Sequence, residues 1–140
     1  MYQRIAHIAL VVKDYDEAID FYVNKLDFQL LEDTKLSKEK RWVIVSPPGA
    51  KECCLLLAKA ADEKQVKNIG NQTGGRVFLF LFTDNFERDF KKYHERNINF
   101  VRPPQDYEYG RAAVFEDLYG NRWDLLEPNE NNKAYIKEKV

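Results

Sequence analysis

The sequence repeats itself at an offset of 70 residues, and this repeat constrains the fold more than any other feature. The segment His7–Asp14 aligns with Val77–Asp84, and each apolar run ends at an aspartate that a glutamate follows three residues later. The same offset aligns Cys54 with Asp124. We therefore expect two copies of one structural unit, related by a pseudo-two-fold axis. Duplication creates a cleft between the copies, where equivalent residues face each other.

Length and composition exclude several classes of protein. The chain has 140 residues, enough for one domain with its own core, and we expect a single domain over residues 1–140. The net charge is −1, and Lys and Arg are scattered, which argues against nucleic acid as a partner. No apolar run approaches the roughly 18 residues of a membrane span, and no cleavable signal opens the chain. Cys53 and Cys54 are adjacent and form no disulfide framework, so we expect a cytoplasmic protein.

Hydrophobic period and turn residues predict the elements of the first unit. Arg4–Val12 is a nearly continuous apolar run, typical of a strand. Asp14 and Glu17 have the spacing of a capping box, which predicts a helix that ends near Leu26. Further strands are expected at about 28–33, 41–45 and 53–58. The unit is therefore β-α-β-β-β.

The second unit repeats this order. We expect a strand over Val77–Phe82, a helix capped by Asp84, and strands near 99–102, 112–116 and 123–127. The expected boundaries are module one at about 3–60, a linker at about 61–75, module two at about 76–128 and a polar, loosely attached tail at 129–140. The predicted fold class is α+β, with two tandem βαβββ modules.

Three sequence features together resemble the vicinal oxygen chelate superfamily over roughly residues 3–128. They are His7 in the first strand, the phrase Ala18–Tyr22 in the first helix, and the closing segment Asp117–Glu127. That superfamily includes glyoxalase I, bleomycin-resistance proteins, fosfomycin-resistance enzymes and extradiol dioxygenases. The resemblance implies a curved mixed sheet around a central cleft. It is more specific for fold than for activity, because one scaffold hosts many chemistries.

The resemblance also implies a divalent metal such as Zn, Ni, Mn or Fe in the cleft. His7 and Asp124 fall on two ligand positions and are the expected metal-binding and catalytic residues. A third position, usually His, falls on Val77, and the fourth falls on Cys54, with Glu52 on the same strand face. The ligand set is therefore incomplete, and a bland alternative is that His7 simply hydrogen-bonds Asp124 inside the protein.

Other side chains fit contacts to a small-molecule substrate. Aromatic residues near strand ends suit a planar ligand, and arginines suit its carboxylate or phosphate. The expected substrate-binding residues are Trp42, Cys54, Val77, Tyr109, Arg111, Phe115 and Arg122. The alternative for the aromatic residues is core packing, and for the arginines it is surface ion pairing.

Two main function classes follow. The first is a glyoxalase-like lyase or dioxygenase-like oxygenase that uses a metal on His7 and Asp124. The second is a metal-independent binding protein of the bleomycin-resistance type, which sequesters an antibiotic-like ligand. A metal-free enzyme with His7 and Asp124 as acid and base is a third reading. We expect a homodimer, and the glycine-rich segment 70–75 would permit exchange of modules between chains.

Overall fold

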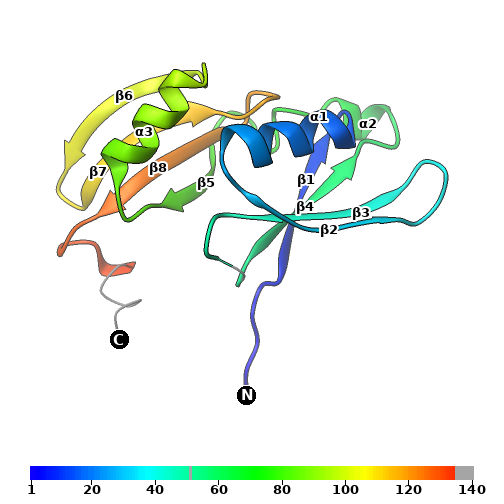
Figure 1. Cartoon of the computed structure of the whole chain (residues 1–140), viewed down its shortest axis with the longest axis horizontal. Helices are drawn as coiled ribbons and strands as arrows, with labels where there is room; N and C mark the ends of the chain where they lie inside the picture. The colour runs from blue at the N-terminus through cyan, green and yellow to red at the C-terminus, as the bar shows by residue number, and fades with distance from the viewer. Residues whose placement is uncertain (51, 135–140) are drawn as a thin grey trace. The chain divides into compact units, whose positions relative to one another are not determined.

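The computed structural model describes residues 1–50 and 52–134, and it divides into two compact units, Met1–Gln72 and Thr73–Val140. Each unit contains one four-stranded mixed sheet with helices (Figure 1). The predicted two-module α+β fold is thus confirmed. The boundary between the units falls inside the segment 61–75 that the sequence suggests as a linker. None of the helices within the described ranges is long and apolar enough to cross a membrane.

The first module is built on a sheet with strand order β1-β4-β3-β2, in which β1 runs parallel to β4 and the other pairs are antiparallel. Its elements are β1 (His7–Val12), α1 (Tyr15–Asp20), η1 (Phe21–Lys25), β2 (Gln29–Lys35), β3 (Arg41–Ser46), β4 (Cys54–Lys59) and α2 (Glu63–Val66). Helix α1 packs on β3 and β4 and covers one face of the sheet. The module's core includes Leu10, Tyr22, Val43 and Leu57, each fully buried. We call the other face of this sheet the open face of the first module.

The first helix begins as its sequence predicts. The Asp14 carboxylate accepts a hydrogen bond from the Glu17 N–H at 2.9 Å, which satisfies a donor of the first turn. After Asp20 the helix continues as a π-helical turn, η1, up to Lys25. Asp27 then adopts a left-handed conformation with φ 61°, and the chain turns into β2.

The second module repeats the arrangement with strand order β5-β8-β7-β6. Its elements are β5 (Val77–Phe82), α3 (Phe86–Glu95), β6 (Phe100–Tyr107), β7 (Gly110–Glu116) and β8 (Arg122–Pro128). Helix α3 packs on β8, and Phe86, Phe115, Trp123 and Leu125 form much of the core beneath it. The opposite face of the sheet is the open face of the second module.

Strand β6 is longer than the sequence indicates, because it continues through two prolines. The predicted strand ended at Arg102, just before Pro103 and Pro104, whose missing N–H groups usually exclude them from a sheet. Here β6 is an edge strand, and its register with β7 shifts between Arg102 and Gln105. An edge strand can lose ladder bonds on that stretch and still resume pairing up to Tyr107.

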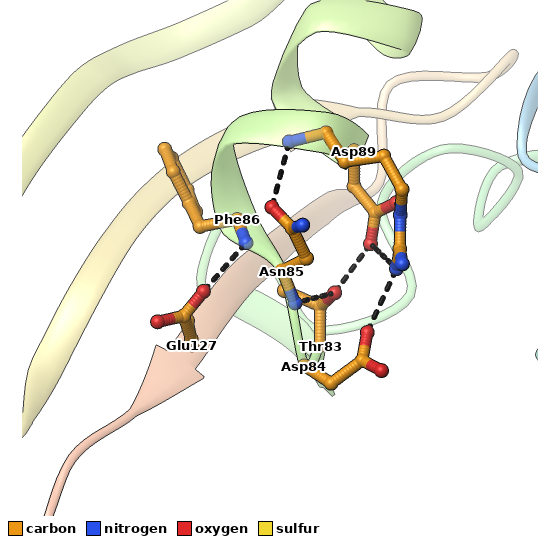
Figure 2. Close-up of polar contacts among 7 residues, drawn as sticks. Thr83, Asp84, Asn85, Phe86, Asp89 and Glu127 are labelled. Carbon is orange, nitrogen blue, oxygen red and sulfur yellow. Dashed lines mark hydrogen bonds and ion pairs between the residues drawn. The ribbon is translucent and has the colours of Figure 1, made fainter.

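The cap of α3 differs from the predicted one (Figure 2). Asn85, and not Asp84, is the N-cap, and its side-chain oxygen accepts from the Arg88 N–H at 3.0 Å. The Asp84 carboxylate instead pairs with the Arg88 guanidinium at 2.8 Å. Thr83 Oγ1 accepts from the Asn85 N–H at 3.1 Å and donates to Asp89, while Glu127 accepts from the Phe86 N–H at 2.7 Å. The prediction for Asp84 was wrong because the later start lets Glu127 and Thr83 satisfy two further backbone donors.

Strand register corrects one equivalence of the sequence repeat. In the second module Asp124 lies beside Val114 and Phe80, and the matching row of the first module runs from Ile44 through Leu56 to Ala9. Asp124 therefore corresponds to Leu56 and not to Cys54. The cause is the connection before the last strand, which spans residues 47–53 in the first module and only 117–121 in the second.

Polar side chains fix the segments that flank the second module. The Gln72 amide accepts from the Val11 N–H at 3.1 Å and donates to the Ala9 carbonyl at 2.6 Å, so it occupies part of the free edge of β1. Asn129 and Asn131 donate to the Glu108 carbonyl at 2.9 and 3.2 Å. Asn132 donates to the Tyr109 carbonyl at 3.3 Å, so hydrogen bonds hold the chain as far as Asn132, and residues 135–140 lie outside the described residues.

Candidate functional site

The open face of the first module carries three of the residues that the sequence predicts for the site. His7 is exposed at the start of β1, and its ring meets Trp42 of β3 edge-on, with centroids 6.2 Å apart and planes at 73°. Cys54 is the register partner of His7 on β4 and is buried. The structure therefore brings His7, Trp42 and Cys54 together on one face of a single module.

Cys54 has the environment of a packed side chain. Burial raises the pKa of the Cys54 thiol, and the neighbouring Cys53 adds to the effect. A raised thiol pKa disfavours the thiolate, which is the form that attacks substrates and binds metals. Glu52 is exposed, and its backbone carbonyl accepts from the Arg4 guanidinium at 3.0 Å.

On the open face of the second module, one row of residues crosses all four strands. In order across the sheet, the row consists of Arg102 on β6, Val114 on β7, Asp124 on β8 and Phe80 on β5. Each residue is the register partner of the next. Register partners project to the same face, and neighbouring strands lie roughly 4.8 Å apart. The row thus places a cation, a carboxyl group and an aromatic ring within reach of one small molecule.

Asp124 is the most unusual polar residue of this row. Its side chain is 92% buried, with 8% exposed, and its Oδ1 atom has no hydrogen-bond partner among the described residues. Burial raises the pKa of the Asp124 carboxyl, and only the Arg102 charge opposes that shift. The charged side chain that acts on Asp124 is Arg102, which the sequence did not indicate. A buried oxygen without a partner costs about 1–3 kcal/mol.

Two tyrosines extend the aromatic character of this face. Tyr107 and Tyr109 stack with centroids 5.2 Å apart and planes at 9°, and Tyr109 is 41% exposed. Burial, and then the charge of Asp124, raise the pKa of the Tyr109 phenol, which keeps it a neutral hydrogen-bond donor. Phe80 is 63% exposed, so the face offers apolar rings on the strand row and beside it.

Phe115 and Arg111 belong to packing in this structure and offer little to a ligand. Phe115 is fully buried and stacks on Trp123 with centroids 6.0 Å apart. The Arg111 guanidinium lies over the Phe86 ring and pairs with Glu87 at 2.9 Å and Asp106 at 3.0 Å. We therefore leave both residues out of the candidate site.

The other two predicted contacts lie at the start of their strands. Val77 is half-buried and is the register partner of Arg122, which is exposed. Arg122 lies two residues before Asp124 on β8, so Val77 and Arg122 form the neighbouring row, at the rim of the candidate site.

Arg102 and Phe80 were not predicted from the sequence. Arg102 was hidden because the predicted strand ended there, and Phe80 because the apolar run Val77–Phe82 gives no period that separates its two faces. A signal existed for Arg102: the 70-residue offset aligns it with Glu32, whose register partner Ile44 lies in the matching row of the first module. Both copies thus carry a charge at this position of the edge strand.

The donor set does not fit a resident metal ion. Among residues 1–50 and 52–134, no group of three or more His, Cys, Asp and Glu side chains is placed to hold one. Leu56, and not a donor, occupies the position that matches Asp124, and Val77 occupies the expected position of a histidine. The charge that acts on Asp124 is that of a cation, Arg102, and not that of a further carboxylate.

With this fold and donor set described, the family can be assigned. The family model of the Glyoxalase/Bleomycin resistance protein/Dioxygenase superfamily matches residues 4–125. This chain belongs to that superfamily, as the sequence motifs indicated.

Similar proteins match this chain over most of its length. An uncharacterized protein of Shewanella frigidimarina is 63% identical over 93% of this chain and 97% of its own length. The crystal structure of UcmS2 superimposes with a TM-score of 0.79 at 27% identity, covering 91% of this chain and 99% of UcmS2. TnmS3, described as an antibiotic binding protein from Streptomyces sp. CB03234, has a TM-score of 0.74 at 29% identity and covers 91% of this chain and 98% of its own.

Proposed function

We propose that this protein binds a planar, antibiotic-like small molecule without a resident metal, on the open face of the second module. The observation that carries the proposal is the row Arg102–Val114–Asp124–Phe80, which combines an exposed ring, a guanidinium and a buried carboxyl oxygen that lacks a partner. Small-molecule sites are mostly apolar surfaces with a few convergent polar groups.

The aromatic residues would supply most of the binding energy. Phe80 and Tyr109 expose 63% and 41% of their surfaces, and covering an aromatic ring removes a large apolar area from water. Because the Oδ1 atom of Asp124 is buried, the side chain would turn toward the ligand and orient it by accepting a hydrogen bond from a hydroxyl or amine. The description of TnmS3 as antibiotic binding supports this class of ligand.

An enzymatic function is the second candidate. A lyase or oxygenase of this superfamily would use a metal on His7 and Asp124, but the described residues offer no third ligand beside either of them. A metal-free reaction with His7 and Asp124 as acid and base is a third candidate. We place both behind binding, because an unpartnered carboxyl oxygen beside exposed rings suits recognition directly.

The test is a titration of the purified protein with bleomycin and with 2-naphthol, by calorimetry, before and after treatment with EDTA. We expect at least one of these ligands to bind equally in both states. Phe80→Ala and Tyr109→Ala should each weaken binding about tenfold, the size of a lost aromatic contact. Tyr2→Ala removes an aromatic side chain that is 84% exposed at the N-terminus and serves as the matched control.

The metal content of the same purified protein distinguishes a metal-dependent enzyme from a binding protein. Stoichiometric Ni, Zn, Mn or Fe that is lost in both His7→Ala and Asp124→Ala would place the metal-dependent function first. Binding that disappears with EDTA, or that is as weak in Tyr2→Ala as in Phe80→Ala, would contradict our proposal.

A further inference from the structure

The first module contains a cavity of about 520 Å³ where β3 begins and β4 ends. This volume is within the roughly 300–1,000 Å³ of pockets that hold drug-sized molecules. The residues that matter for its chemistry are Tyr15, Lys40, Trp42, Ala58, Lys59 and Gln65. All of them belong to the first module, so the cavity is separate from the row on the second module.

The cavity exists because two neighbouring strands part. The antiparallel ladder between β3 and β4 runs from Val45–Leu55 to Val43–Leu57, and no further pair is formed toward Arg41 among the described residues. Each strand stays attached on its other side, since β3 pairs with β2 as far as Arg41, and β4 pairs with β1 as far as Lys59. The gap is therefore held open by the rest of the sheet.

A tyrosine compensates for the missing ladder bond. The Arg41 N–H donates to the Tyr15 hydroxyl oxygen at 3.1 Å. Tyr15 is buried beneath the Arg41 guanidinium, which lies 5.1 Å from the ring centroid and pairs with Asp16 and Asp33. The Arg41 N–H, which has no partner on β4, is thus satisfied by Tyr15. The charge of the Arg41 side chain is already balanced by two carboxylates.

The polar groups around the cavity are mainly donors. The Gln65 carbonyl oxygen is used by the Ala61 N–H at 2.8 Å, which leaves the amide N–H₂ group to donate. The Tyr15 oxygen accepts from Arg41, and its own proton is free to donate. Lys40 and Lys59 add two ammonium groups. Glu39 is the one carboxylate among the lining residues, and it lies 4.0 Å from Lys59 on an exposed rim, where such a pair contributes little.

The remaining wall is apolar and includes one large ring. Trp42 lies on β3, and Leu56 and Ala58 lie two residues apart on β4, so both project to the same face of the sheet as Trp42. An indole beside small aliphatic side chains suits the flat face of an aromatic ring. A donor-rich rim over an apolar floor is complementary to a flat molecule that bears an anionic acceptor.

We propose that this cavity is a second binding site, which takes a small aromatic carboxylate with its ring against Trp42 and its carboxylate at Lys40 and Lys59. The site is independent of the proposed function on the second module. Its ligand is distinguished from that of the second module by its negative charge.

The probe is 2-naphthoate, titrated against the full-length protein by calorimetry beside its neutral analogue 2-naphthamide. We expect 2-naphthoate to bind at least about tenfold more tightly than 2-naphthamide, as one charge-assisted contact predicts. Lys40→Met and Lys59→Met together should remove this preference and keep the weak binding of the amide. Ala58→Phe should block both probes by filling the space.

Two controls keep the outcomes distinct. Phe80→Ala and Asp124→Leu lie on the second module and should leave the affinity for 2-naphthoate unchanged, even if every ligand of that module fails to bind. Chemical-shift changes on the wild-type protein should map to the Trp42 indole and the Ala58 methyl group, a readout that needs no variant. Equal affinity for acid and amide, shift changes confined to the second module, or no binding of either probe would overturn the proposal.

Discussion

At the scale of single residues, Asp124 is a buried polar group that lowers the stability of the second module. Its Oδ1 atom is buried without a partner, and burial raises the pKa of the carboxyl. Near pH 7 the folded protein must therefore bury a charge, or hold a proton that the unfolded chain would release. Residues that destabilise a fold at a surface suited to binding are often kept for function.

We expect Asp124→Leu to be more stable than the wild type by about 1–2 kcal/mol at pH 7, since it removes an unpaired buried polar group. The folded-state pKa lies above the unfolded one, so the penalty in the wild type decreases as the pH falls through the folded-state value. The difference between the two proteins should therefore shrink between pH 7 and about pH 4, the ordinary range of a carboxyl group. Urea unfolding at several pH values measures this.

Asp124→Asn is the control that keeps shape and removes only the charge. It should recover part of the stability at pH 7 and show the same loss of pH dependence. A Leu variant that is less stable than the wild type at pH 7 would mean that the carboxyl makes a stabilising interaction, and the argument from its missing partner would fail.

At the scale of elements, the N-terminus of α3 could be capped by either of two neighbouring residues. Asp84 and Asn85 are both good N-cap residues, and only the surrounding structure selects Asn85 (Figure 2). Asn85→Ala should cost about 1 kcal/mol of unfolding free energy, the usual value of a cap. Asp84→Ala removes an exposed ion pair to Arg88 and should cost clearly less. Urea unfolding of the two variants compares them, and a larger loss in Asp84→Ala would restore the original prediction.

Most elements could be predicted because their signals are local. The apolar run of β5 gave its bounds, Val77–Phe82, and Asp14 gave the start of α1. The errors arose where pairing with a neighbouring strand decides the outcome. The prolines of β6 are tolerated only because that strand lies at the edge of its sheet, and sequence period does not reveal an edge.

The candidate site was predictable only in part, for the same reason. His7, Trp42 and Asp124 stand out by residue type and motif, whereas Arg102 and Phe80 join Asp124 through register across four strands. The connection 47–53 is two residues longer than the connection 117–121. The residue of the first module that is equivalent to Asp124 is therefore Leu56 and not Cys54. Such a shift changes which side chains face one another, and no local pattern reports it.

At the scale of the whole molecule, the segment 70–75 would control any exchange of modules between two chains. Its glycines Gly70, Gly74 and Gly75 have φ values of 76°, 70° and 104°, which suit a mobile connection. The Gln72 amide, however, makes two hydrogen bonds to the backbone of β1 and holds the segment on that strand. The linker is therefore anchored at its centre, between glycines in left-handed conformations.

We predict a homodimer at micromolar concentration, measured by sedimentation velocity, and sedimentation as a monomer would remove that prediction. If modules are exchanged, chains can part only when the segment leaves β1. Gln72→Ala removes two hydrogen bonds of about 1 kcal/mol each, so subunit mixing between two differently labelled preparations should accelerate about tenfold or more. Thr73→Ala is the matched control, because its hydroxyl donates only to the nearby Arg76 carbonyl at 2.6 Å. Equal mixing rates in Gln72→Ala and Thr73→Ala would show that the dimer forms without exchange through this segment. The hydrogen bonds between Gln72 and β1 would then not limit the dissociation of the two chains.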